Sequence, residues 1–247
     1  MTAPLPGWWA TLAERAADAT TETFTRLPTP PAGGRPSAVL VLLGEDAPTA
    51  DGSGTVPGPD VLVLQRAASM RKHPGQPAFP GGASDAEDTG PADTALREAT
   101  EEVGLDRSTV QVVTTLPQLW IPVTGFVVTP VLGWWREPHP VRPMAHEEVA
   151  RVERLPVAEL VDPDNRIRVR HPSGYLGPAF KVRDMVVWGF TAGVLNAVLE
   201  LAGWDRPWDP DRVEDLPSEQ VDQVPADRLA ALRGLAERDA PDTGSNP

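Results

Sequence analysis

Acidic side chains cluster in a stretch, residues 91–103, that the sequence predicts to be a helix. At about 100° per residue, Glu98, Glu101 and Glu102 fall within one wedge of that helix. Like charges at this spacing destabilise a helix by roughly 0.2–0.5 kcal/mol per pair unless another group compensates. A divalent cation would compensate, and hard oxygen ligands suit Mg²⁺ or Mn²⁺, which bridge phosphate oxygens and acidify a bound water. The cluster is therefore a candidate metal site for phosphate chemistry, with a solvated acidic surface as the alternative.

The same stretch carries the signals that would position these acids. Pro91 suits a first helical turn, where its missing N–H is not needed, and Gly104 suits the end of the helix. Arg97 lies on the far flank of the acids, one turn from Glu101, where it can pair with the glutamates. An apolar arc beside the acids would bury the helix against a sheet, and it consists of Ala92, Ala95, Leu96, Ala99 and Val103.

Apolar runs elsewhere predict the strands and helices that surround this helix. Residues 37–44 and 60–66 read as two buried strands joined by a turn over residues 45–59, and residues 67–82 read as a loop. Helical spacing of apolar residues predicts a second long helix over residues 185–202. Further strands are predicted at residues 110–116, 126–135 and 166–171, and short helices at residues 8–17 and 156–161.

Composition limits the classes of protein to which the chain can belong. A net charge of −13 argues against broad binding to nucleic acid, which needs a basic face. The absence of cysteine leaves carboxylates and histidines as the plausible metal ligands. We see no signal-peptide pattern and no apolar stretch long enough to span a bilayer, so we expect a cytoplasmic protein without membrane contact.

The chain divides on composition into three parts. Residues 1–36 form an N-terminal extension with the short helix, and residues 37–203 form the main domain. Residues 204–247 form an acidic, Pro-rich C-terminal extension. A candidate amphipathic helix within it, residues 227–238, carries Leu229, Leu232 and Leu235 and could pack on the domain or on another subunit.

The stretch from Gly81 to Leu105 resembles the Nudix box, the strand, loop, helix and loop motif of Nudix hydrolases. The resemblance rests on the Gly-Gly turn, Arg97 with the EATEE string, and the closing Gly104-Leu105. Counting back from Arg97, Thr89 holds the usual place of the loop glutamate and Ala83 that of the glycine. One extra loop residue restores the match, since it aligns Gly82 with the glycine and leaves Asp88 or Glu87 near the loop acid.

The stretch before the box, residues 62–82, resembles the extra signature of the coenzyme A pyrophosphatase branch of the family. The longer loop is also typical of that branch, and residues 186–195 are similar to one of its helix starts. The resemblance covers about residues 37–201. The signature places are held by Leu62-Val63, Arg66, Arg71, Gly75 and the run from Phe79 to Gly82.

This resemblance implies an α/β fold, the Nudix-type α/β/α sandwich with a mixed central sheet. It implies that Glu98 and Glu102 hold Mg²⁺ or Mn²⁺, that Glu101 adds a ligand or orients the nucleophilic water, and that Arg97 fixes the glutamates. The backbone of Gly82 would approach the ion. It also implies that coenzyme A, a small nucleotide substrate, is cut to 3′,5′-ADP and 4′-phosphopantetheine, and it favours a homodimer.

Substrate phosphates would be received by positive charge from the loop, namely Arg66, Arg71 and Lys72, with His73 assisting. Glu147 and Glu148 resemble an acidic segment that follows the box and could supply a further ligand or a general base. Arg66 could instead pair with a surface acid, His73 could be an ordinary loop histidine, and both glutamates could be solvated. Other open readings are hydrolysis of ADP-ribose or NADH and a noncatalytic nucleotide-binding module.

Overall fold

The computed structural model describes residues 3–25, 33–70, 73–122, 124–172 and 174–216. Two sheets and five α-helices make up this part of the chain. The strands of the main sheet are β1 Arg35–Pro48, β2 Thr55–Arg66, β3 Pro77–Ala78, β4 Gly81–Ala83, β5 Val110–Thr115, β6 Leu119–Ile121, β7 Phe126–Trp135 and β8 Val149–Pro156. The second sheet contains β9 Arg166–Arg170, β10 Leu176–Val182, β11 Met185–Val187 and β12 Val213–Asp215. The α-helices are α1 Ala10–Ala17, α2 Thr21–Phe24, α3 Pro91–Val103, α4 Val157–Leu160 and α5 Gly189–Ala202.

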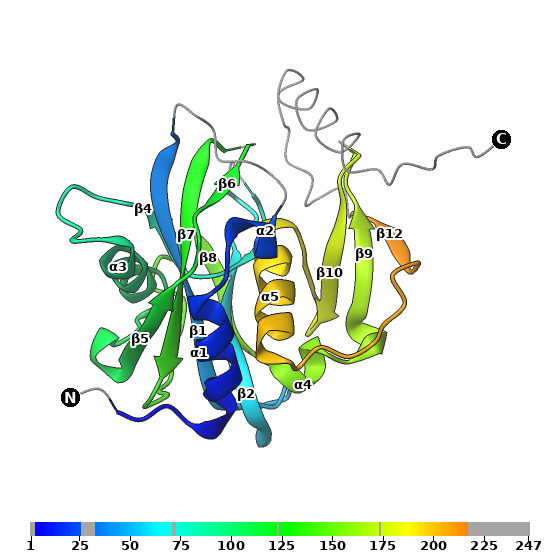
Figure 1. The fold of residues 1–247 in the computed structure, drawn as a ribbon, viewed down its shortest axis with the longest axis horizontal. Coiled ribbons are helices and arrows are strands. Elements are labelled where there is room, and N and C mark those ends of the chain that lie inside the picture. The colour runs from blue at the N-terminus through cyan, green and yellow to red at the C-terminus, as the bar shows by residue number, and fades with distance from the viewer. Residues whose placement is uncertain (1–2, 26–32, 71–72, 123, 173, 217–247) are drawn as a thin grey trace.

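The main sheet lies between two helical layers, with α3 on one face and α1 and α5 on the other (Figure 1). Its strand order is β3-β2-β1-β7-β5, with β4 paired to β1, β6 to β7 and β8 to β2. Strands β1 and β7 run parallel, whereas β1 is antiparallel to β2 and β4, so the sheet is mixed. The predicted α/β/α sandwich with a mixed central sheet is confirmed.

The central strand β1 shows why its sequence is a continuous apolar run. Leu40 and Leu42 pack in the core beneath α3, whereas Val41 and Leu43 pack in the core beneath α5. All four side chains are fully buried. A strand that is covered on both faces needs apolar residues at every position rather than at alternate positions.

The N-terminal segment belongs to the same packed structure. Trp9 and Leu12 are fully buried in the core that α5 shares, and α1 lies against α5. The predicted short helix at residues 8–17 is present, as a 3₁₀ turn at Gly7–Trp9 followed by α1. The three-part division of the chain stays a prediction, and the candidate helix at residues 227–238 lies outside the described residues.

The predicted start of the second long helix is wrong. Residues 185–187 form strand β11, which pairs antiparallel with β10, and α5 begins only at Gly189. A tight turn at Arg183 and Asp184, both with positive φ, folds the chain back onto β10. Gly189 has a φ of 62°, which ends the extended stretch before the helix.

The prediction of a plain loop over residues 67–82 is also wrong in part. This segment contributes β3, which pairs with β2, and begins β4, which pairs with β1. The turn predicted at residues 45–59 is shorter than expected, because β1 continues to Pro48 and β2 begins at Thr55. The sheet therefore extends to Ala83, and the loop of residues 84–90 joins it to the acidic helix.

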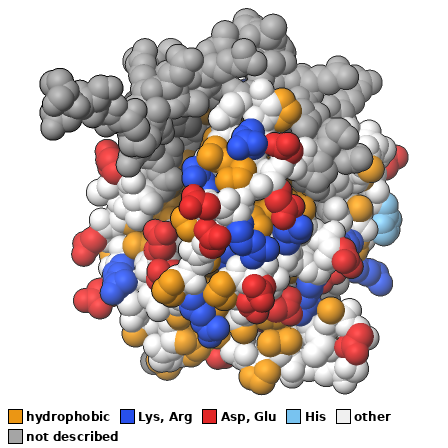
Figure 2. Space-filling view, turned by 90° about the vertical axis from the view of Figure 1, so that its right-hand side faces the viewer, with side chains coloured by type: hydrophobic (Ala, Val, Ile, Leu, Met, Phe, Trp, Pro, Cys, Tyr) orange, Lys and Arg blue, Asp and Glu red, His pale blue; other side chains and the backbone are white. Residues whose placement is uncertain are grey.

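The second sheet forms one side of the molecule, which faces the viewer in Figure 2. Lys181 pairs with Glu214 at 3.0 Å, and Arg170 pairs with Asp215 at 3.3 Å. Acidic and basic side chains are interspersed over the described part of this face (Figure 2). Among the residues that the structure describes, no helix has the length and apolar character needed to cross a membrane.

Candidate active site

Helix α3 is fixed on the sheet by its apolar arc. Ala95, Ala99 and Val103 are fully buried and pack on the β1 side chains Leu40 and Leu42. The helix has the predicted bounds, and Gly104 ends it with a left-handed φ of 70°. The packed arc sets the rotation of the helix and therefore the direction in which each glutamate points.

Strand β4 brings two glycines against the acidic edge of α3. The Gly81 N–H donates a hydrogen bond of 2.9 Å to Glu102 Oε2. A Cβ atom at Gly82 would lie 2.4 Å from Glu98 Oε1, closer than any side chain can approach. Glu98 and Glu102 therefore lie beside backbone that only glycine allows, and their oxygens and the local carbonyls are hard donors.

Glu102 is a buried acid. Its exposed fraction is only 6%. Burial raises the pKa of Glu102 to about 8, although the Gly81 N–H acts to lower it. The negative charges of Glu98 and Glu148 raise this pKa further, whereas the charge of Arg66 lowers it. These charges all act on one buried carboxylate, which a divalent cation would stabilise in its ionised form.

Glu98 shares this environment. Its side chain is 18% exposed, and burial raises the pKa of Glu98 while the adjacent Arg97 guanidinium lowers it. The neighbouring Glu101 charge raises that pKa again. Two carboxylates with raised pKa values, next to glycine backbone, fit the donor set of a hard divalent metal ion.

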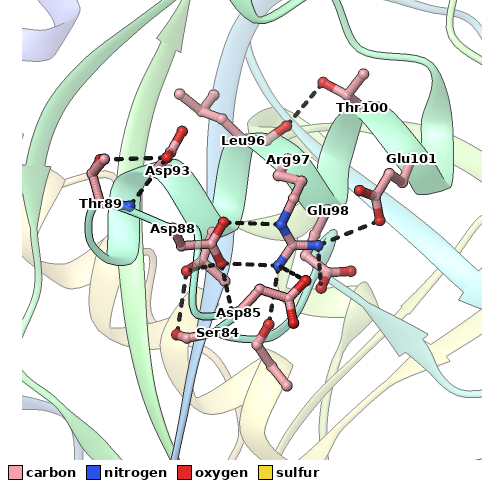
Figure 3. Close-up of polar contacts among 12 residues, drawn as sticks. Ser84, Asp85, Asp88, Thr89, Asp93, Leu96, Arg97, Glu98, Thr100 and Glu101 are labelled. Atoms are coloured by element: carbon pink, nitrogen blue, oxygen red, sulfur yellow. Dashed lines mark hydrogen bonds and ion pairs between the residues drawn. The ribbon is translucent and has the colours of Figure 1, made fainter.

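Arg97 is held by the loop that precedes α3 (Figure 3). Its Nε and Nη2 atoms each donate to Asp88 at 3.0 Å, and Nη2 also donates to the Ala83 carbonyl at 3.1 Å. Its Nη1 atom donates to Glu98 at 3.0 Å. The side chain of Asp88 is 5% exposed, and its hydrogen bonds to Arg97 hold the pKa of Asp88 well below its ordinary value. Arg97 therefore makes a two-pronged contact with Asp88 of the loop and also bonds Glu98, so it links the loop to Glu98.

The sequence left two candidates, Glu87 and Asp88, for the acid of this loop. Asp88 pairs with Arg97, whereas Glu87 is exposed to solvent. The Thr94 hydroxyl, fully buried on α3, donates to Asp88 Oδ2 at 2.8 Å and orients it. No local sequence signal singled out Thr94, because its role depends on the path of the loop.

Glu101 takes a different position from the other two helix acids. Its side chain is 59% exposed and contacts Arg97 Nη1 at 3.4 Å, on the side of Arg97 away from Asp88 (Figure 3). Over the described ranges, no group of three Asp, Glu or His side chains is arranged to hold a metal ion. The structure thus brings Glu98 and Glu102 together at Gly81 and Gly82, and leaves Glu101 at the solvent edge.

Of the predicted basic residues, the structure places Arg66 near the acids. Arg66 ends β2, and its charge acts on Glu102. The Arg66 Nε atom is buried and has no hydrogen-bond partner among the described residues. His73, with a φ of 53°, contacts Gln76 at 3.1 Å. Arg71 and Lys72 lie outside the described residues.

Glu147 and Glu148 precede β8 and are both exposed. The Glu148 carbonyl accepts a 2.7 Å hydrogen bond from the N–H of Ala67, the residue after β2. Its carboxylate acts on the pKa of Glu102, so Glu148 lies at the site. No comparable contact connects Glu147 with the described part of the site.

A model of the NUDIX domain matches residues 36–175, more than half of the 247 residues. The chain therefore belongs to the Nudix family. An uncharacterized Nudix hydrolase NudL from Enterobacter sp. (strain 638) is 40% identical over 150 residues, which cover 56% of this chain and 72% of the relative. A NudL from Escherichia coli (strain K12) is 38% identical over 147 residues, which cover 57% of this chain and 73% of the relative.

Among solved structures, a Nudix hydrolase from M. smegmatis, RenU, is similar with a TM-score of 0.47 and 21% identity, over 73% of this chain and 96% of that one. The family match and the NudL relatives define the enzyme class that the sequence predicted. The chain is a Nudix pyrophosphatase, a hydrolase that acts on phosphorus-containing acid anhydrides. Nudix hydrolases generally work with divalent metal ions on small nucleotide-derived substrates.

Proposed function

We propose that the enzyme cuts the pyrophosphate of coenzyme A or of an acylated derivative, giving 3′,5′-ADP and 4′-phosphopantetheine or its acyl form. The observation that supports the proposal is that the charge of Arg66, at the end of β2, acts on the buried carboxylate of Glu102. The signature that resembles the coenzyme A branch runs from Leu62 to Gly82. The charge of its first arginine acts on Glu102, and its closing glycines lie against the Glu98 and Glu102 side chains of the box.

Glu98 and Glu102 are proposed to hold Mg²⁺ or Mn²⁺, with the backbone of Gly82 close to the ion. When bound, the ion neutralises charge on the diphosphate and lowers the pKa of a bound water. Arg97 keeps the Glu98 carboxylate at Gly82, because its own guanidinium is fixed by Asp88 and the Ala83 carbonyl. Metal binding would ionise Glu102, which its burial otherwise disfavours.

The reaction needs a water to attack one phosphorus while the bridging oxygen leaves with the other phosphate. Glu101 orients this water or adds a ligand, because its carboxylate is exposed to solvent beside Arg97. Glu148 supplies a further ligand or accepts the proton of the water, because it lies at the site and is exposed. The Arg66 Nε atom, which has no hydrogen-bond partner among the residues that the structure describes, can donate to a substrate phosphate oxygen.

A substrate panel tests this proposal. Coenzyme A, acetyl-coenzyme A, ADP-ribose and NADH are assayed with Mg²⁺ or Mn²⁺, and products are identified by mass spectrometry. We expect kcat/KM for a coenzyme A substrate to exceed that for ADP-ribose and NADH by about tenfold or more, the discrimination expected of a built site. A preference for ADP-ribose or NADH would show that the upstream signature does not choose the substrate.

Binding without turnover of any of these compounds would favour a noncatalytic module instead. The variant Arg66→Ala should weaken kcat/KM for the preferred substrate by about tenfold to a hundredfold if a charge-assisted hydrogen bond to phosphate is lost. The resemblance also favours a homodimer, and sedimentation velocity of the purified chain measures the oligomeric state.

A further inference from the structure

The carboxyl end of α3 is held by a segment from elsewhere in the chain. The last carbonyls of an α-helix have no partner within the helix and must bond outside it. The Met144 N–H donates to the Glu102 carbonyl at 2.9 Å, and the Arg142 N–H donates to the Val103 carbonyl at 3.2 Å. We call residues 140–148 the strap, since they cross the end of the helix that carries Glu102.

The strap connects the helix end to β2 as well. The N–H groups of Glu148 and Val149 both donate to the Ala145 carbonyl at 2.8 Å, which turns the chain into β8. At this turn the Glu148 carbonyl accepts from Ala67, one residue beyond Arg66. A single backbone path therefore joins Glu102, Met144, Glu148 and the end of β2.

Side chains of the strap differ in how they take part in this contact, since Val141 packs against the core that contains Val103. Met144 is 49% exposed, although it is a large apolar residue. A hollow of about 290 Å³ lies between the strap and the helix end, lined by Val103, Gly104, Pro140, Val141, Arg142 and Met144. Gly104 leaves the room that the strap needs, because a Cβ there would lie 3.2 Å from Met144 Cγ. The strap is thus held to the helix by its backbone hydrogen bonds and by Val141, while the Met144 side chain is half exposed.

We propose that Met144 is a positioning residue for Glu102, acting through its backbone N–H, and that the strap fixes the metal-binding end of the helix. Glu102 is the second-last residue of α3, where helices fray most easily. The hydrogen bond to its carbonyl keeps the last turn formed and the carboxylate at Gly81. The inference rests on the proposed metal site at Glu98 and Glu102.

The test compares two substitutions at one position. Met144→Pro removes the N–H, whereas Met144→Ala keeps the N–H and removes the side chain. Mn²⁺ affinity without substrate is measured by electron paramagnetic resonance of the free ion. We expect Met144→Pro to weaken Mn²⁺ binding by about tenfold to a hundredfold, the usual effect of losing a group that orients a ligand. Met144→Ala should bind within about twofold of the unmodified protein, because the hydrogen bond remains.

A second replacement tests the same N–H even if the proline variant fails to fold. The α-hydroxy analogue of methionine at position 144 turns the amide N–H into an ester oxygen and keeps the side chain. It should weaken Mn²⁺ binding in the same direction, and raising Mn²⁺ should restore hydrolysis. Unchanged affinity in the ester variant would overturn the proposal, as would an equal loss in Met144→Ala.

Glu102→Gln, measured alongside, separates this inference from the proposed function. If the unmodified protein and Glu102→Gln bind Mn²⁺ equally, Glu102 is no ligand, and the metal site and the strap proposal fail together. If Glu102→Gln loses affinity while both backbone variants keep it, only the strap proposal fails. A loss in Glu102→Gln and in both backbone variants supports both.

Discussion

The two long helices of this enzyme cover opposite faces of one sheet and bury different kinds of residue. Helix α5 buries eight side chains, and none of them is ionisable. Helix α3 buries the acid Glu102 among its apolar residues. Both helices end at a glycine with a φ of 70°, Gly203 in α5 and Gly104 in α3.

Their carboxyl ends also differ in how the last carbonyls are satisfied. Arg15 from α1 reaches the Glu200 and Leu201 carbonyls of α5 with its side chain, at 3.4 and 3.5 Å. The end of α3 is bonded by the backbone of the strap instead. The apolar helix contributes stability, whereas the acidic helix gives up some stability to bury a carboxylate.

The largest expected effect is a loss of activity when the buried acid of α3 is replaced. Glu102→Gln should lower kcat/KM by about a thousandfold or more, because the variant loses the carboxylate that is proposed to hold the metal ion. The protein should remain folded, because glutamine can still accept the Gly81 N–H. Steady-state kinetics and circular dichroism measure the two properties. Glu137→Gln, at an exposed acid, is the control, and equal activity in both variants would remove Glu102 from the mechanism.

The matching change is in α5, on the other face of the sheet, and it should lower the free energy of unfolding. Leu195 is fully buried in α5, and Leu195→Ala should lower the free energy of unfolding by about 2–5 kcal/mol through lost burial and a cavity. Leu201→Ala, at a half-buried position of the same helix, should cost less. Urea denaturation measures both variants. A loss of kcat in folded Leu195→Ala would show that α5 also shapes the site.

Local signals explain how far the sequence predicted this arrangement. Pro91 and Gly104 mark the two ends of α3, and helical geometry alone grouped Glu98, Glu101 and Glu102 on one edge. Which of these acids is buried could not be predicted, because it depends on how β4 approaches the helix. The structure distinguishes them by exposure, with Glu102 buried and Glu101 open to solvent.

Contacts between distant segments account for most of the remainder. Residues 185–187 fit helical spacing, and only the turn at Arg183 and Asp184 with its partner β10 makes them a strand. The choice of Asp88 over Glu87 depends on the path of the loop around Arg97. The strap could not be predicted for the same reason, because backbone hydrogen bonds do not require particular side chains and so give no signal in the sequence.

A smaller effect tests the clamp on Arg97. Asp88→Asn removes the charge that holds the guanidinium in two hydrogen bonds, so Glu98 should be positioned less well. We expect kcat/KM to fall by about tenfold to a hundredfold, the range for misplacement of a catalytic group. Asp85→Asn is the matched control, because Asp85 is 69% exposed and 3.7 Å from Arg97. If both variants behave alike, the loop does not position Glu98 through Asp88.

The smallest expected effect concerns the pH dependence of stability without metal. Glu102 has a pKa of about 8 in the folded protein and an ordinary value of 4.5 when exposed. Because the folded pKa is the higher one, the stability from protonated Glu102 is fully present below 4.5 and is lost as pH rises towards 8. The free energy of unfolding should fall by at most about 1.4 kcal/mol per pH unit in this window.

Comparison with Glu102→Gln isolates this contribution, because Glu98 and Glu148, whose charges act on Glu102, remain in both proteins. Urea denaturation in a chelator, at several pH values between 5 and 9, should give a steeper decline for the unmodified protein than for the variant. Added Mg²⁺ or Mn²⁺ should reduce the difference between pH values, since binding to the ionised acid stabilises the folded state. Parallel profiles for the two proteins would mean that Glu102 ionises normally despite its burial, and that α3 gives up no stability at this position.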